Sequence, residues 1–130
     1  MTILTIRTDK PEAEIGLYVE GVQKAYETWH AHRALAETLH AKIADLLTRH
    51  GLSLQDLGGI ACYKGPGSFT GLRIGLTVGN ALAHGLQIPI GSETGAHWQE
   101  KAIQRFREGD YDILALPEYG ADVHITPPKQ

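Results

Sequence analysis

The amino-terminal part of the chain alternates apolar and polar residues with a period of two, which is typical of strands. This pattern predicts two strands at residues 3–6 and 15–19, and residues 22–29 keep β-branched and aromatic residues at strand density. Glu20-Gly21 is the expected tight turn between the second and third strands. Three consecutive strands with short links predict an antiparallel meander.

The rest of the chain mixes helical periodicity with short apolar runs. The expected elements are a helix at 33–50 that ends at Gly51, a strand at 57–63, a helix at 69–85, a strand at 88–90, a helix at 96–106 and a last strand at 113–116. This order predicts a mixed α/β domain whose helices cover a sheet. We expect residues 1–110 to form one α/β domain and residues 111–130 a C-terminal strand and extended tail.

The helix expected at 69–85 is apolar over an arc of about 220°, whereas burial on one side typically needs about 100°. Four small residues recur every four positions within that arc and form one ridge: Gly71, Gly75, Gly79 and Ala83. Each glycine lowers helix stability by up to about 1 kcal/mol relative to alanine, so close packing must compensate. The ridge therefore predicts the close approach of another helix.

The helix expected at 33–50 is the first candidate to fill this ridge. Its own apolar arc spans about 120°, which suits a helix seated on a sheet and leaves little to cover a neighbour. We therefore predict that part of the second helix, with the His40 and Ala44 edge of the first, binds a partner. The candidate interface residues are Ala36, His40, Ile43, Ala44, Leu47, Gly71, Leu72, Gly75, Leu76, Gly79 and Ala83.

The glycine-rich stretch KGPGSFTGLRIGLTVG at residues 64–79 invites comparison with loops that carry chemistry. It lacks the Gly-Lys-Ser/Thr ending of a phosphate loop and the third glycine of a dinucleotide fingerprint. Pro66 and Thr70 stand where a nucleophile elbow around Ser68 would need glycines. The start of a helix can hold an anion, or Ser68 can simply cap it. The candidate loop residues are Gly65, Pro66, Gly67, Ser68, Thr70 and Arg73.

The net charge and the cysteine count exclude some classes of protein. The net charge of −3 and the pI near 6.1 give no basic stripe for strong binding of nucleic acid by this chain alone. Cys62 is the only cysteine, so no internal disulfide can form, and a reducing cytoplasm is the expected location. No secretory signal or membrane span is expected.

The histidines, the cysteine and the tryptophans are interpreted as structural residues and not as parts of a catalytic or metal site. His30, His32 and His40 lack a further ligand at regular spacing, so no metal or cofactor site is expected. Cys62 lies in an apolar strand and is interpreted as a core residue. Trp29 and Trp98 are interpreted as core or interface residues.

The segment GPGSFTGLRIG at residues 65–75, after a strand and at the start of a helix, resembles the signature of the TsaB family, also called YeaZ. The surrounding segments ILTIRTD at 3–9 and ALAHGLQIPIG at 81–91 match the layout of that family. The resemblance covers roughly residues 1–100. It implies an RNase H-like/actin-like (ASKHA) N-terminal domain with a mixed five-stranded sheet.

The same resemblance implies a function and a set of partners. TsaB proteins are implied to be non-catalytic partners of TsaD, which, with the ATPase TsaE, places a threonylcarbamoyl group on an adenosine beside the tRNA anticodon (t6A). The two helices discussed above are implied to build the contact with TsaD, or with a second TsaB copy when the chain is alone.

Two departures from the family pattern bear on function. Arg7, Thr8 and Asp9 stand where family members have Asp-Thr-Ser, and Arg7 argues against a metal and nucleotide site. The second, similar domain of the family is expected to be absent. The leading hypothesis is therefore a scaffold subunit that binds TsaD. The alternatives are a small ATPase or hydrolase that uses the Ser68 and Thr70 loop, and a homodimer with another partner.

Overall fold

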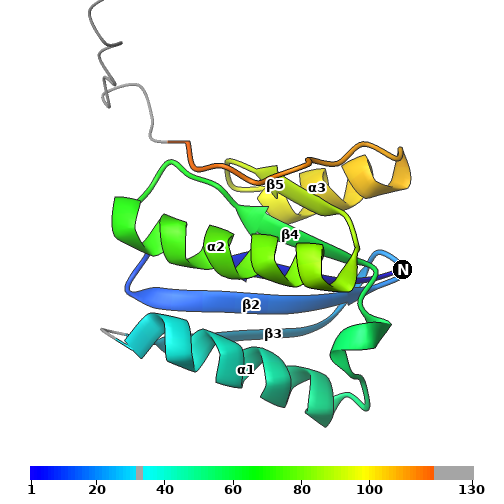
Figure 1. Ribbon diagram of the computed structural model, residues 1–130, viewed down its shortest axis with the longest axis horizontal. Coiled ribbons are helices and arrows are strands. Elements are labelled where there is room, and N and C mark those ends of the chain that lie inside the picture. The colour runs from blue at the N-terminus through cyan, green and yellow to red at the C-terminus, as the bar shows by residue number, and fades with distance from the viewer. Residues whose placement is uncertain (32–33, 119–130) are drawn as a thin grey trace, which may run out of the picture.

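The computed structural model describes residues 1–31 and 34–118, apart from the side chain of Phe69. The elements, in chain order, are β1 (Thr2–Arg7), β2 (Glu12–Val19), β3 (Val22–His30), α1 (Leu35–Arg49), the 3₁₀ turn η2 (Leu54–Asp56), β4 (Gly59–Tyr63), α2 (Phe69–Leu86), β5 (Ile90–Glu93) and α3 (Trp98–Arg107) (Figure 1). This order confirms the mixed α/β class predicted from the sequence.

The five strands form one sheet in the order β3-β2-β1-β4-β5. Strands β1, β2 and β3 pair antiparallel, which confirms the predicted meander, whereas β4 pairs parallel to both β1 and β5. The link between β2 and β3 is the expected tight turn, because Glu20 and Gly21 both have positive φ, 52° and 78°.

Helices cover both faces of the sheet. One core cluster joins Leu39 and Leu46 of α1 and Leu76 of α2 to Leu4 and Ile6 of β1. On the opposite face, a second cluster joins Trp98, Ala102 and Phe106 of α3 to neighbours such as Ile3 and Ala61. The period of two in β1 sends alternate side chains into the two cores.

The ends of the helices follow the expected signals only in part. Gly51 has a φ of +69° just after α1, as a glycine stop requires. Helix α2 continues past Gly85 to Leu86, and its C-cap residue Gln87 takes the left-handed conformation with a φ of 57°. This conformation is uncommon for residues other than glycine but is allowed, so the helix can end there without a glycine.

The strand predicted at residues 113–116 is wrong. Among the described residues, the strand-type pairing of this part of the chain is a single isolated bridge between Ile90 and Asp112. The strand expected at 88–90 is displaced, because β5 runs over Ile90–Glu93. Residues 110–118, which we call the strap, instead run past β5 and α2 without a ladder of their own (Figure 1). Among the described residues, no helix combines the length and the apolarity needed to cross a membrane.

Candidate functional site

The glycine ridge of α2 faces the sheet of its own domain. A Cβ atom on Gly71 would overlap the carbonyl oxygen of Thr8, and one on Gly75 would overlap the Thr8 hydroxyl. A Cβ atom on Gly79 would lie 2.5 Å from the Cys62 Sγ atom of β4. The predicted close approach of another helix to this ridge is therefore wrong, because the end of β1 and the middle of β4 fill it.

This packing changes the status of the candidate interface. The side of α2 that carries Leu72, Leu76 and Ala83 is buried with the ridge, and Ile43 and Leu47 of α1 lie in the same core cluster as Leu76 and Ala83. Gly75 and Gly79 are buried as well, while Gly71 is half-buried. These residues cannot line an exposed surface in this structure, because they form the middle of the arcs by which both helices sit on the sheet.

The remaining candidates lie on the surface. Ala36, His40 and Ala44 follow one another at intervals of four along α1, and all three are exposed. Ala36 and His40 border a groove of about 460 Å³ between α1 and α2. On the α2 side the groove is lined by Thr70, Arg73, Ile74, Thr77 and Val78.

The exposed edge of α2 also has small residues at intervals of four, which our sequence reasoning missed. Thr77, Ala81 and Gly85 are all exposed, and half-buried Ile74 lies beside them. Ala81, Gly85 and Ile74 belong to the apolar arc predicted from the sequence. The surplus apolar surface of α2 is therefore present, but on this edge and not on the glycine ridge.

The glycine-proline-glycine loop is fastened to the end of β1. The Ser68 amide donates to the Asp9 carbonyl at 3.3 Å, and the Thr8 hydroxyl donates to the Gly71 carbonyl at 2.6 Å. A Cβ atom on Gly67 would lie 2.5 Å from the Asp9 side chain. The glycines of the loop thus permit close contact with the link between β1 and β2.

Two further loop residues are held by neighbours. The Tyr63 hydroxyl donates to the Pro66 carbonyl at 2.7 Å. Gly65 has a φ of +118°, and a side chain there would overlap the Glu118 carbonyl of the strap. Ser68 is the N-cap residue of α2 as predicted, but its hydroxyl forms no capping hydrogen bond. The start of α2 is held by the backbone contact with Asp9 instead.

The guanidinium of Arg7 pairs with the carboxylate of Asp9 beside this loop. Its Nε donates to Asp9 Oδ1 at 2.7 Å and its second nitrogen to Oδ2 at 3.3 Å, while the guanidinium lies 3.8 Å from the centre of the Tyr63 ring. Burial lowers the pKa of Arg7, but the hydrogen bonds and charge of Asp9 outweigh it, so the pKa lies above its ordinary value. A cation at Asp9 would have to displace this guanidinium.

A cavity of about 600 Å³ opens beside this pair, with Asp9, Lys10, His30, Ser68 and Thr70 among its lining residues. The structure thus brings the exposed hydroxyls of Ser68 and Thr70 to one rim. His40 borders the groove between α1 and α2 instead. His32 lies outside the described residues. Within 1–31 and 34–118, no three His, Cys, Asp or Glu residues are placed to hold a metal ion.

The two tryptophans have different environments. Trp98 is buried in the core under α3, where it meets Tyr63 edge to face with the ring centres 5.9 Å apart. Trp29 is half-buried beside α1 and donates its indole N–H to Thr38 at 3.1 Å. Both contacts lie within the domain, as the interpretation of these residues as core allows.

Cys62 lies in the core, as predicted, and is 1% exposed. Burial, with a contribution from the charge of Asp112, raises the pKa of its thiol to about 12. We expect a thiol reagent at about pH 8 to modify the folded chain at least about 100-fold more slowly than the chain in denaturant. A colorimetric thiol assay measures both rates, and equal rates would contradict the burial of this residue.

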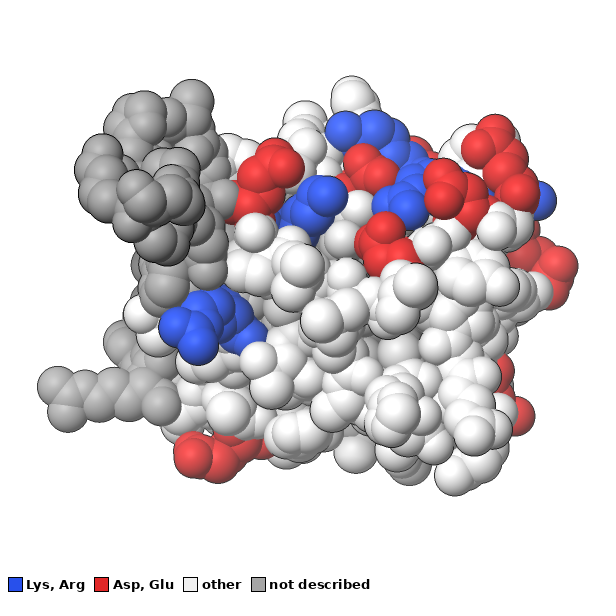
Figure 2. All heavy atoms as spheres, turned by 45° about the horizontal axis from the view of Figure 1, so that its top comes forward, with Lys and Arg blue, Asp and Glu red and all other residues white. Residues whose placement is uncertain are grey.

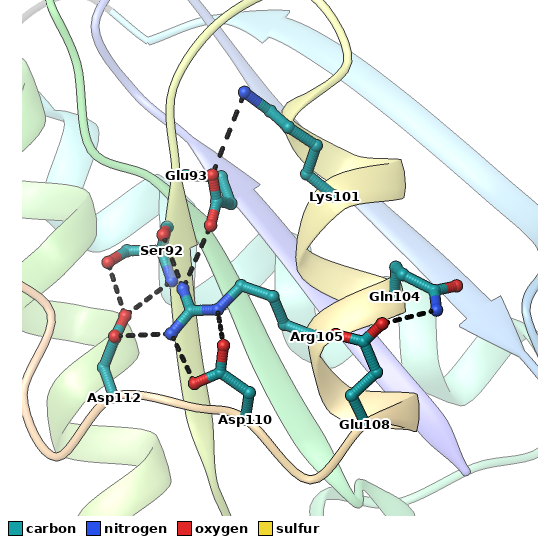
Figure 3. Close-up of polar contacts among 8 residues, drawn as sticks. All are labelled: Ser92, Glu93, Lys101, Gln104, Arg105, Glu108, Asp110 and Asp112. Carbon is teal, nitrogen blue, oxygen red and sulfur yellow. Dashed lines mark hydrogen bonds and ion pairs between the residues drawn. The ribbon is translucent and has the colours of Figure 1, made fainter.

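An arginine at the end of α3 fastens the strap to the sheet (Figure 3). Arg105 donates to Asp112 at 2.9 Å, to Asp110 at 3.2 Å and to Glu93 at 3.1 Å. Asp112 also accepts from the Ser92 amide and hydroxyl at 2.9 and 2.7 Å. No local pattern along the chain indicates this cluster, because its members come from β5, α3 and the strap.

The Asp112 carboxylate makes the strap sensitive to acid. Burial raises the pKa of Asp112, but the hydrogen bonds from Arg105 and Ser92 outweigh it and hold the pKa below its ordinary value of 3.8. A lowered pKa stabilises the fold above the ordinary value, and this contribution is lost as the pH falls through the folded value. We expect the free energy of unfolding to fall more steeply below about pH 4 in the wild type than in Asp112→Asn. Urea unfolding at several pH values measures the difference, and parallel curves would contradict it.

Comparisons with known proteins agree with this fold and with the motif. A family model described as TsaD, tRNA N6-adenosine threonylcarbamoyltransferase, matches residues 29–95. The tRNA threonylcarbamoyladenosine biosynthesis protein TsaB of Escherichia coli is 36% identical over 95 residues, covering 69% of this chain and 38% of that protein. The chain thus spans about two fifths of the length of the curated TsaB relatives it matches.

Solved structures give the same assignment. YeaZ from Pseudomonas aeruginosa aligns with a TM-score of 0.68 at 30% identity, covering 83% of this chain and 49% of that chain. RuvC from Thermus thermophilus aligns with a TM-score of 0.51 at 15% identity, covering 96% and 87% of the two chains, and this likeness shows the RNase H-like fold alone. The motif at residues 65–75, the fold and these relatives together show that the chain belongs to the TsaB (YeaZ) family.

Proposed function

We propose that this chain acts in t6A modification of tRNA as a non-catalytic subunit that binds TsaD through the outer edges of α1 and α2. The observation that carries the proposal is the groove between these helices. Its lining consists mostly of short or uncharged side chains. These include Ala36 and His40 on one side and Ile74, Thr77 and Val78 on the other. Small side chains on both rims leave room for the backbone of a partner helix.

The arrangement beside the motif loop supports a binding role over catalysis. Both oxygens of Asp9 already accept hydrogen bonds from Arg7, at 2.7 and 3.3 Å. The space beside Gly67 is filled by Asp9 in the link after β1, and the space beside Gly65 by Glu118 of the strap. The loop therefore serves to bring α2 against the sheet, and α2 in turn presents its outer edge to a partner.

The test is to mix the purified chain with the TsaD protein of the same organism and to measure molar mass by light scattering. We expect a complex of the two chains, and a homodimer when the chain is alone. If the chain remains a monomer in both samples, the proposal is wrong. Calorimetric titration with ATP and Mg²⁺ tests the alternative, since firm binding by the chain alone would favour an ATPase that uses the Ser68 and Thr70 loop.

A further inference from the structure

The strap is attached to the domain mainly through polar contacts. Within residues 110–118, only Ala115 has a buried side chain. Ile113 is fully exposed, and Tyr111, Leu114 and Leu116 are each more than half exposed. An exposed side chain gains no free energy from burial, so hydrophobic packing does little to hold this segment. The attachment of the strap therefore depends on hydrogen bonds and ion pairs.

Two contacts hold the second half of the strap. Asn80 of α2 donates to the Ala115 carbonyl at 2.8 Å and accepts from the Ala115 amide at 2.9 Å. Further along, the Glu118 amide donates to the Lys64 carbonyl at 2.7 Å. Neither contact belongs to a helix or to a ladder of the sheet. Both can therefore break while the helices and strands stay intact, which is the condition for local opening.

Asp112 fastens the first half of the strap to β5, the last strand of the sheet (Figure 3). Its backbone amide donates to the Ile90 carbonyl at 2.7 Å. Its carboxylate accepts from the Ser92 amide at 2.9 Å and from the Ser92 hydroxyl at 2.7 Å. The strap thus satisfies two backbone groups of an edge strand. In the closed position it covers an edge that is otherwise open to pairing with another extended segment.

Ionisable side chains surround Asp112 from α2, α3, β4, β5 and the strap itself: His84, Arg105, Cys62, Glu93, Asp110 and Tyr111. Figure 2 shows most charged side chains of the visible face gathered near the top, with both signs next to each other. Arg105 is the cation paired with Asp112, at 2.9 Å, and it also contacts Glu93 at 3.1 Å and Asp110 at 3.2 Å. Loss of the Asp112 charge therefore leaves Arg105 with two other carboxylates and no unpaired charge.

We propose that the strap is an acid-sensitive latch on the outer edge of β5, which opens as a unit while the sheet and the helices stay folded. Protonation of Asp112 favours the open position, because the carboxylate then loses its ion pair with Arg105. Opening returns the Ile90 carbonyl and the Ser92 amide to the edge of the sheet, where a further strand can pair with them.

Hydrogen exchange of individual amides, measured by NMR on the full chain in low concentrations of urea, tests whether the latch opens by itself. The reporters are the amides of Asp112, Ala115, Glu118 and Ser92, whose hydrogen bonds break when the strap opens. The reference is the Ile60 amide of buried β4, which donates to the Pro89 carbonyl at 3.0 Å. Urea accelerates an opening in proportion to the surface that it exposes.

We expect the four reporters to have the same protection within about threefold and to keep it at low urea, while the protection of Ile60 falls. If the reporters lose protection in parallel with Ile60, the strap opens only with the whole domain, and the latch is refuted. Reporters with no protection in any condition would also refute it, because the strap would then have no closed position.

The variant Leu39→Ala separates the two openings without urea. Leu39 is a fully buried residue of α1, and none of the strap contacts described above involves α1. The substitution should accelerate exchange at Ile60 by at least about 30-fold, as expected for a core leucine, and leave the four reporters unchanged. Equal acceleration at both places would contradict an independent opening of the strap.

Asp112→Asn tests the trigger, since asparagine has a similar shape but cannot ionise. The hydrogen bonds of the closed strap hold the pKa of Asp112 below its ordinary value of 3.8, so they favour closure above that value and lose their effect as the pH falls through the folded value. At pH 7 the variant should lower the protection of the reporters by at least about tenfold. Below about pH 4, corrected for intrinsic exchange rates, protection should fall further in the wild type than in the variant. The same pH dependence in both chains would overturn the assignment of the trigger to Asp112.

Discussion

The substitution Gly71→Ala is expected to destabilise the domain by about 3 kcal/mol, at the upper end of the range for overpacked cores. The added methyl group would overlap the carbonyl oxygen of Thr8, which is backbone and cannot rotate away. Moving α2 outward would also stretch the 2.6 Å hydrogen bond from the Thr8 hydroxyl to the Gly71 carbonyl. Urea unfolding followed by circular dichroism measures the effect.

The same helix supplies the control. Gly85 also belongs to α2, but nothing lies within 4 Å of the position its Cβ would take. Gly85→Ala is therefore expected to stabilise the domain by about 0.5 to 1 kcal/mol, since alanine is the better helix former. If both substitutions stabilised the domain, helix propensity would explain them and the close packing of Gly71 on Thr8 would be refuted.

The second large effect is expected on binding. Ala36→Arg should weaken the complex with the TsaD protein by at least about 100-fold, because a partner in the groove would have to bury an unpaired charge. Ala36 is exposed and borders the groove, and the new guanidinium would share it with Arg73. Isothermal titration calorimetry with wild-type and variant chains gives the two dissociation constants.

Ala41→Arg is the matched control for this effect. Ala41 is also an exposed alanine of α1, but it does not line the groove. We expect it to change the affinity by less than about threefold, as is usual for surface substitutions outside an interface. Equal loss of affinity in both variants would point to a general charge effect and against docking in the groove. Circular dichroism of both chains checks that they are folded.

These two pairs of variants separate two functions of α2 that the sequence combined. The glycine ridge holds the helix against β1 and β4, and the opposite edge with Thr77, Ala81 and Gly85 is left for a partner. A substitution at Gly75, one of the interface residues expected from the sequence, would collide with Thr8 and would therefore test the fold and not the binding of a partner. Residues for a binding experiment are better taken from the exposed edge.

The local pattern of apolar and polar residues was sufficient to predict most of the strands and helices. The alternation in β1 and β2, the turn at Glu20-Gly21 and the helical periods predicted the elements, because each depends on residues within a few positions of one another. The boundaries were less certain, as the displaced β5 shows. The strand expected at 113–116 failed for a different reason: its apolar run has strand composition, but the amide and carbonyl of Ala115 bond to the Asn80 side chain and not to a neighbouring strand.

The sequence by itself determined the class of fold, the family motif and the surplus of apolar surface on α2, since all three are properties of residue order and composition. Only the tertiary structure decided which side of α2 is buried. A helical wheel gives the width of an apolar arc but not the neighbour that fills it, and that neighbour is Thr8, 63 residues away in the chain. The Arg105 cluster and the anchored strap depend in the same way on contacts between distant elements, which no local pattern contains.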